Sequence, residues 1–199
     1  WMLEHAHPLI KVTIVPRGKA LGAAWYLPEE RQLTTKEQML DEICSLLGGR
    51  AAEELFLGTV CTGALNDLER VSKHAYAIVT YYGMSDKLSN VSYYDSTGSS
   101  DFSFKQPYSE QTAQLIDQEV KALIDSQYER AKAILKENAA GHNQLADLLV
   151  EREVIFADDL EHIFGKRTWT SRTEELFQEN KKLAATEAAA LEESSSQEE

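Results

Sequence analysis

The chain has 199 residues, of which 43% are hydrophobic, and its 33 acidic side chains outnumber the 20 lysines and arginines. A chain of this length can bury one sizeable core, so we expect one domain with a tail. The formal net charge of −13 repels phosphate backbones, which argues against nucleic-acid binding. The two cysteines, Cys44 and Cys61, form no Cys-x-x-Cys pair and indicate no disulfide framework. No run approaches the roughly 20 apolar residues of a membrane-spanning helix.

The first residues are apolar, and position 1 is not a methionine. Trp1, Met2 and Leu3 are expected to be the end of a helix that begins upstream. On this pattern we expect the chain to be a fragment of a longer protein.

Two short runs near the amino end have the pattern of a β-hairpin. Residues 10–15 alternate apolar and polar side chains, as a half-buried strand does. A turn signal follows at residues 16–19, and residues 22–27 can return as a second strand that Pro28 ends. Another short strand is predicted around residues 90–93.

The remaining pattern is mostly helical. Thr34 and Thr35 each precede Glu or Gln by three residues, which gives two overlapping capping boxes at the start of the first helix. Gly48 and Gly49 lie inside that helix, where each costs ~1 kcal/mol relative to alanine. We expect another backbone to approach them closely, and the helix to continue to Gly58.

Three further helices and a last turn are predicted. The second helix covers about 66–82, with Gly83 in a C-terminal capping position. Ser109 opens a long helix, a shorter one surrounds residues 145–149, and the last turn begins at Asp158. The predicted fold is therefore mainly α (α+β), with a small β-hairpin near the amino end.

Composition divides the chain at about residue 165. Residues 1–165 carry the helical and strand patterns, whereas residues 166–199 end in a stretch of alanine, glutamate and serine. Such a stretch cannot bury enough apolar surface to offset its ordering entropy. We therefore predict an acidic, disordered tail over 166–199.

Asp67 is the leading candidate for a functional residue. It opens a strongly helical segment just behind a glycine turn at Gly63, so a rigid helix would hold its carboxylate in one place. The segment alone favours a helix cap, because acidic residues stabilise the first turn. The alternative is a single metal ligand whose partner ligands lie elsewhere.

The other chemistry-bearing side chains have ordinary structural explanations. His5 and His7 suit a turn better than a metal pair, and His74 lies two helical turns beyond Asp67, too far for both to reach one ion easily. His142 and His162 are expected at the surface, and Cys44 is expected to be an inert thiol in the core. No His-Glu-x-x-His or nucleotide-binding glycine motif occurs. The chain itself thus offers no catalytic and no cofactor-binding residue.

Six short motifs follow one another along the first 165 residues. They are residues 5–18 (HAHPLIKVTIVPRG), 20–22 (ALG), 27–28 (LP), 47–54 (LGGRAAEE), 62–70 (TGALNDLER) and 82–85 (YGMS). In this order and spacing they resemble the peptidase domain of FtsH-type ATP-dependent zinc proteases, including the mitochondrial m-AAA proteases. The family usually has aspartate where this chain has His7, a difference outside the metal-binding set.

The resemblance implies a zinc site with three protein ligands. Two are the histidines of a His-Glu-x-x-His helix, whose glutamate is the general base, and this motif is expected just upstream of Trp1. The third is the aspartate of the Thr-Gly-Ala segment, which is Asp67 here. Glu54 is the second choice, against the ordinary alternative that Glu53 and Glu54 are salt-bridged or solvated around Arg50.

The resemblance also implies the function of the longer protein. We expect the C-terminal proteolytic domain of a membrane-anchored, homo-hexameric, ATP-dependent zinc metalloendopeptidase that degrades unfolded or damaged proteins. ATP would bind an upstream module, and membrane segments would precede that module, both outside this sequence. The domain would lie in the bacterial cytoplasm or, alternatively, on the mitochondrial matrix side. The edge of the hairpin at residues 10–27 would pair with extended polypeptide substrates.

The chain by itself is expected to be inactive, because it would hold one zinc ligand of three and no general base. The competing interpretation is a non-catalytic helical oligomerisation module that has lost the zinc motif. A third, a free-standing helical adaptor, would need a start codon at Trp1. The sequence encoded upstream of Trp1 discriminates among the three.

Overall fold

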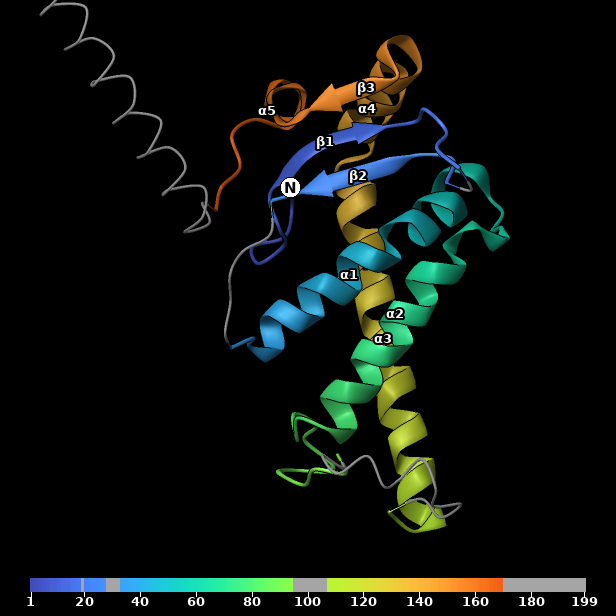
Figure 1. Cartoon of the computed structure of the whole chain (residues 1–199), viewed down its shortest axis with the longest axis vertical. Helices are drawn as coiled ribbons and strands as arrows, with labels where there is room; N and C mark the ends of the chain where they lie inside the picture. Colours follow the sequence, from blue (N-terminus) through green and yellow to red (C-terminus); the bar gives the residue numbers. More distant parts are fainter. Residues whose placement is uncertain (19, 28–32, 95–106, 170–199) are drawn as a thin grey trace, which may run out of the picture. The chain divides into compact units, whose positions relative to one another are not determined.

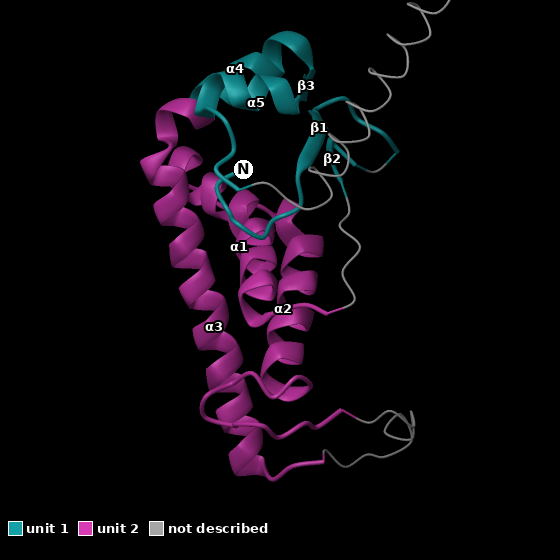
Figure 2. Ribbon diagram, turned by 90° about the vertical axis from the view of Figure 1, so that its left-hand side faces the viewer, with its two compact units in different colours: residues 1–32, 143–199 teal, residues 33–142 magenta. Residues whose placement is uncertain are grey.

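The computed structural model describes residues 1–18, 20–27, 33–94 and 107–169 (Figure 1). The chain forms two compact units, one of residues 1–32 and 143–199 and the other of residues 33–142 (Figure 2). We call them the sheet unit and the helical unit. The elements confirm the predicted mainly α fold with a small hairpin near the amino end.

Three helices and two short turns build the helical unit. They are α1 (Lys36–Ala52), the π-turn η1 (Glu53–Leu57), the 3-10 turn η2 (Thr62–Ala64), α2 (Leu65–Thr80) and α3 (Glu110–Glu137). Each helix contacts the other two. Their shared core includes side chains that are almost fully buried: Ile43, Leu47, Val71, Ile78 and Ile116. Burial of such a side chain contributes about 1.5–3 kcal/mol, so this core is the main source of stability of the unit.

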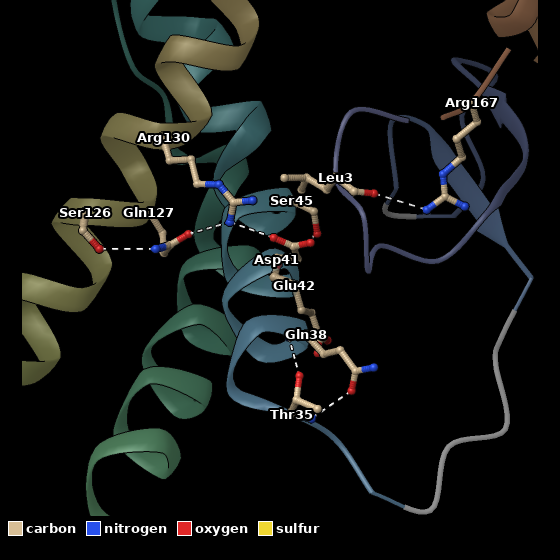
Figure 3. A network of polar contacts seen from close by, with 10 residues as sticks. All are labelled: Leu3, Thr35, Gln38, Asp41, Glu42, Ser45, Ser126, Gln127, Arg130 and Arg167. Atoms are coloured by element: carbon tan, nitrogen blue, oxygen red, sulfur yellow. Dashed lines mark hydrogen bonds and ion pairs between the residues drawn. The ribbon is translucent and has the colours of Figure 1, made fainter. Parts of the chain in front are cut away.

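Side-chain caps begin α1 and α3 where the sequence predicts them. Of the two overlapping boxes, the one at Thr35 forms, since its Oγ1 accepts from the Gln38 amide at 3.3 Å and Gln38 Oε1 accepts from the Thr35 amide at 2.8 Å (Figure 3). At α3, Ser109 Oγ accepts from the Thr112 amide at 3.2 Å. These contacts satisfy amides that have no partner inside the helix.

The double glycine does not interrupt α1. The helix runs through Gly48 and Gly49 to Ala52, and a Cβ at either glycine would meet no described atom within 4 Å. The expected close approach of another backbone is therefore wrong within the described residues. Burial of the flanking Leu47 and Ala51 offsets the low helix propensity of the two glycines.

An ion pair between a buried carboxylate and a guanidinium that is 42% exposed joins α1 to α3. Asp41 Oδ1 lies 2.7 Å from Arg130 Nη1, and the Asp41 side chain is only 4% exposed. Arg130 also donates to Gln127 Oε1 at 3.2 Å (Figure 3). Cys44, three positions after Asp41, is also buried, and this burial raises the pKa of its thiol to about 11. The prediction that Cys44 is a core thiol is thus confirmed.

The sheet unit contains three antiparallel strands in the order β2-β1-β3. β1 (Leu9–Thr13) pairs with β2 (Ala23–Tyr26) through Leu9↔Tyr26 and Val12↔Ala24, which confirms the hairpin. On its other side, β1 pairs with β3 (Val154–Phe156). The sheet thus joins segments that lie about 140 positions apart, and β1 is its central strand.

Two strand predictions differ from the structure. β3 was not predicted, because three residues are too few to show an alternating pattern. The strand predicted around 90–93 does not form. Instead, the Tyr93 amide donates to the Thr80 carbonyl at the end of α2, at 2.8 Å, so this segment caps a helix rather than pairing with a strand.

The last described elements are α4 (Ala139–Arg152) and α5 (Ala157–Phe164). Asp159 Oδ2 accepts from the Phe156 amide at 2.9 Å, as an N-terminal cap does. Most of the predicted tail lies outside the described residues. Residues 1–3 have no regular secondary structure, so the expected helix end is not observed, and polar groups of the first six residues bond instead to residues 165–167.

Candidate metal-ligand site

A short connection in the helical unit leads from α1 to Asp67. Gly58 ends the π-turn η1 with a left-handed φ of +66°, which glycine adopts without steric cost. Cys61 then caps η2, and its Sγ accepts from the Gly63 amide at 3.4 Å. Ala64 is buried at 8% exposure, and α2 starts directly after it. The Thr-Gly-Ala motif is therefore one tight turn that sets the first residues of α2.

Asp67 lies in the first turn of α2 and is half-buried. The N-cap position belongs to Ala64, which has no side-chain hydrogen bond. No hydrogen bond or ion pair joins the Asp67 carboxylate to another described residue. Any capping effect of Asp67 therefore comes from the helix dipole alone, and its oxygens remain available to an external partner.

The neighbouring cations of α2 are all bound to other carboxylates. Arg70 Nη2 lies 3.3 Å from Glu42 Oε1, and Lys73 Nζ lies 2.6 Å from Glu69 Oε1. Because these side chains point to partners of their own, they do not neutralise Asp67. Among the described residues Asp67 thus has no cation partner, which leaves its carboxylate open to an external one.

Glu53 braces the connection that precedes Asp67. Its Oε2 accepts from the Cys61 amide at 3.0 Å, and its Oε1 accepts from the Cys61 thiol at 2.6 Å. These hydrogen bonds hold the pKa of Glu53 below its ordinary value. From the sequence, Glu53 was expected to be solvated or salt-bridged, with a role as a rival metal carboxylate less favoured. Its contact with Cys61 was not predicted, because an eight-residue separation across a π-turn has no recognisable pattern.

The side chain of Glu54 contacts two residues of α3. It accepts a hydrogen bond from the Tyr128 hydroxyl, and its Oε1 lies 3.3 Å from Lys132 Nζ. Both contacts lower the pKa of Glu54, the hydrogen bond from Tyr128 having the larger effect. The salt-bridged alternative therefore describes Glu54, although its partner is Lys132 and not Arg50. A carboxylate already bound in this way is a poorer candidate for a metal ligand than Asp67.

The histidines form no metal cluster with these carboxylates. His74 Nδ1 lies 3.7 Å from Glu42 Oε2, and His162 Nδ1 lies 2.6 Å from the Asp158 carbonyl oxygen. His142 is not the surface residue we predicted, since its ring stacks on Phe56 with centroids 4.3 Å apart. Within the described ranges, no three His, Cys, Asp or Glu side chains gather closely enough to hold a metal ion.

The donor set therefore fits one part of a zinc site. A zinc ion takes about three or four protein ligands, and Asp67 is one helix-borne carboxylate without a hydrogen-bond or ion-pair partner among the described residues. Asp67 fits as one oxygen ligand, and a zinc ion bound there would need ligands beyond the side chains that lie near Asp67 in the described residues.

A comparison with known families decides the classification. Residues 1–163 match the family model described as "Peptidase family M41". The chain belongs to this family. The match covers all of the described strands and helices except the last residue of α5, and it confirms the predicted resemblance.

Curated relatives carry consistent names. The chain is 64% identical over 197 residues to "ATP-dependent zinc metalloprotease FtsH" of Parabacteroides distasonis, covering 96% of this chain and 29% of that protein. The FtsH protein of Karelsulcia muelleri is 53% identical over 82% of this chain and 26% of its own length. Mouse "Mitochondrial inner membrane m-AAA protease component AFG3L2" is 46% identical over 87% of this chain and 21% of its own length.

The chain thus spans less than a third of the length of these relatives. A search of the described helices for one long and apolar enough to cross a bilayer finds none.

Proposed function

We propose that this chain is the C-terminal proteolytic part of a membrane-anchored, ATP-dependent zinc metalloendopeptidase that degrades unfolded or damaged proteins. The observation that carries the proposal is the unpaired carboxylate of Asp67, presented by the Thr-Gly-Ala turn of an M41-family chain. Two histidine ligands and the general-base glutamate would come from a His-Glu-x-x-His helix before Trp1, and ATP would bind a separate upstream module.

Each part of the connection has a role in this proposal. Asp67 would be one of the residues that hold the zinc ion, while Glu53 and Cys61 keep the turn before it in one conformation. A zinc ion held there would supply Lewis-acid activation of a water molecule and of the substrate carbonyl. The absence of a cation partner for Asp67 leaves its charge available to stabilise the ion.

The sheet supports a finer proposal for substrate binding. Since β1 is paired on both sides, it has no free edge for a substrate, and the hairpin can offer only the outer edge of β2. An extended polypeptide would add there as a further antiparallel strand through main-chain hydrogen bonds. Because such main-chain pairing depends little on the side chains of the substrate, it suits the degradation of many unfolded proteins.

Assembly and location follow from the family relationship. The relatives are named as bacterial FtsH proteases and as a component of a mitochondrial inner-membrane protease. We propose a homo-hexamer whose membrane segments precede the ATPase module, with this domain in the bacterial cytoplasm or, alternatively, on the matrix side of the mitochondrial inner membrane.

The decisive experiment compares Asp67→Asn with Glu69→Gln in the longer protein that carries the natural upstream sequence. Glu69 is the matched control, because it is an exposed acid on the same helix that pairs only with Lys73. We expect Asp67→Asn to weaken zinc binding by well over tenfold, since even outer-shell partners are worth about 10–100-fold. Casein degradation should fall with it, while ATP turnover survives.

Two results would contradict the proposal. Full zinc content and normal degradation in Asp67→Asn would exclude Asp67 as a zinc ligand. Glu54 would then be the next candidate ligand to test. A longer protein that assembles but binds no zinc would identify the non-catalytic oligomerisation module instead. Hydrolysis of casein by the 199-residue chain alone would disprove its predicted inactivity.

A further inference from the structure

The helical unit contains a pocket that all three of its helices help to line. The volume of this pocket is about 240 Å³, and its lining comes from the first two turns of α1, from the end of α2 with the residues after it, and from the middle of α3. Figure 2 shows these three helices in magenta. Pockets for drug-sized ligands have about 300–1,000 Å³, so this pocket suits a smaller molecule.

Apolar side chains from each of these segments line the pocket. Ile78 and Val79 of α2 are almost fully buried, while Leu40 of α1 and Leu123 of α3 are half-buried. Met84 completes this apolar lining, and its unbranched side chain can adapt to the shape of a ligand. The pocket can therefore receive an aliphatic group.

Glu119 also lines the pocket, but its carboxylate already has partners inside the unit. Its Oε2 accepts from Ser85 Oγ at 3.0 Å, and its Oε1 lies 2.7 Å from Lys87 Nζ. The hydrogen bond from Lys87 is the main reason why the pKa of Glu119 lies below its ordinary value. Because Lys87 balances its charge, Glu119 leaves little net charge to attract a ligand.

Two opposite charges of the lining have no such partner. Lys36 is half-buried and Asp86 is exposed, and neither side chain forms a hydrogen bond or an ion pair with another described residue. Lys36 acts on Glu119 only as a smaller contribution to its lowered pKa. Since a half-buried ammonium group has lost part of its hydration, it gains from an anionic partner. Among the described residues, the pocket thus combines one available cation and one available anion with an apolar lining.

We propose that this pocket binds a free α-amino acid with an aliphatic side chain, such as leucine. The carboxylate of the ligand pairs with Lys36, its ammonium group pairs with Asp86, and its side chain lies against Ile78 and Val79. A simple amine or carboxylic acid leaves one of the two charges without a partner, and a polar amino acid leaves the apolar lining uncovered. The inference does not depend on the proposed function, because no residue of the pocket belongs to the candidate metal-ligand site.

The first test titrates the 199-residue chain with leucine at neutral pH and follows its amide NMR signals. We expect saturable shifts at the residues that line the pocket, with a dissociation constant on the order of 0.1–1 mM for a ligand of this size. Leucinamide lacks the carboxylate, isocaproate lacks the ammonium group, and glycine lacks the aliphatic side chain. Each analogue should bind at least about tenfold more weakly, because each leaves one part of the pocket without its partner.

The second test removes the two charges separately. Lys36→Met should weaken leucine binding about tenfold and leave leucinamide binding unchanged, because leucinamide has no carboxylate to lose its partner. Asp86→Asn should weaken leucine binding by a similar factor and leave isocaproate binding unchanged. The matched controls are Lys121→Met and Asp125→Asn, which change an exposed ion pair of α3 that does not line the pocket. Both controls should bind leucine as the wild type does.

Three results would overturn the inference. The first is the absence of saturable shifts with leucine, and the second is leucinamide or isocaproate binding as tightly as leucine. The third is an equal loss of leucine and leucinamide binding in Lys36→Met, which would mean that Lys36 acts on the fold and not on the ligand carboxylate. Because the titration needs neither zinc nor residues outside this chain, its failure would leave the proposed role of Asp67 untouched, and normal zinc binding by Asp67→Asn would leave the pocket untouched.

Discussion

The helical unit contains the same two reactive groups, a carboxylate and a thiol, in two contrasting environments. In the contact between α1 and α3, Asp41 is paired with Arg130 and Cys44 is buried. In the connection between α1 and α2, Cys61 is exposed and Asp67 has no partner among the described residues. Asp41 and Cys44 are thus enclosed by the fold, whereas Cys61 is exposed even though its thiol donates to Glu53. The contrast shows that the same residue types occupy quite different environments within one unit, so residue type alone does not mark a site.

The largest effect is expected from breaking the pair of Arg130 with the buried Asp41. Arg130→Met leaves the Asp41 carboxylate buried opposite an apolar side chain, which should lower the free energy of unfolding by about 3 kcal/mol. Denaturant unfolding followed by circular dichroism measures the loss. Lys73→Met is the control, because it removes a cation from an exposed pair that contributes little. Equal stability of the two variants would show that the two environments do not differ as described.

The thiols provide the second test of the contrast. With a pKa of about 11 for Cys44, only about one part in a thousand of this thiol is thiolate at pH 8, and burial restricts access further. Alkylation of native Cys61→Ser, in which only Cys44 remains, should therefore be at least about a hundredfold slower than alkylation of Cys44→Ser. Rates should converge in denaturant. Comparable alkylation rates in the two native variants would mean that the Cys44 thiol is accessible to the reagent.

The smallest effect is expected from removing the brace, by which we mean the two hydrogen bonds that Glu53 accepts from Cys61. Glu53→Ala should speed exchange of the Cys61 amide and alkylation of its thiol severalfold, because the Glu53 carboxylate accepts hydrogen bonds from both groups. Glu54→Ala is the matched control, since its contacts lead to Tyr128 and Lys132 instead. If both variants behave alike, Glu53 does not brace the connection.

The same brace has a predictable pH dependence. The pKa of Glu53 is lowered in the folded state, so its contribution is fully present above the ordinary carboxyl pKa of 4.5 and is lost as the pH falls through the lowered value. Exchange at Cys61 relative to that in α1 should rise only in this acidic window, and Glu53→Ala should abolish the rise.

Features set by neighbouring residues could be predicted from the sequence. The caps at Thr35 and Ser109 each depend on a side chain and an amide three positions apart, so the pattern is visible in a short window. The hairpin was predictable for the same reason. The ligand role of Asp67 stays a prediction that rests on a family motif and not on spacing, because a first-turn acid has the same pattern whether it caps a helix or binds a metal.

Features set by distant residues could not be predicted. β3 forms only because β1 offers an edge about 140 positions away, and the contacts of Arg167 with residues 3–6 span more than 160 positions. The π-turn that directs Glu53 towards Cys61 has no sequence signature. The partner of Glu54 was misjudged for a related reason, since Lys132 lies on another helix while Arg50 is a neighbour in sequence.

The arrangement of the sheet has a consequence for biosynthesis. Residues 33–142 are inserted between the two halves of the sheet unit, and β1 receives β3 only after residue 156 has been made. Until then one side of β1 is an unsatisfied edge, open to pairing with other nascent chains. Helices with local contacts form fast, whereas a strand pair closed over so long a loop forms slowly. The inserted helices should therefore fold on the ribosome first, and the sheet should close last.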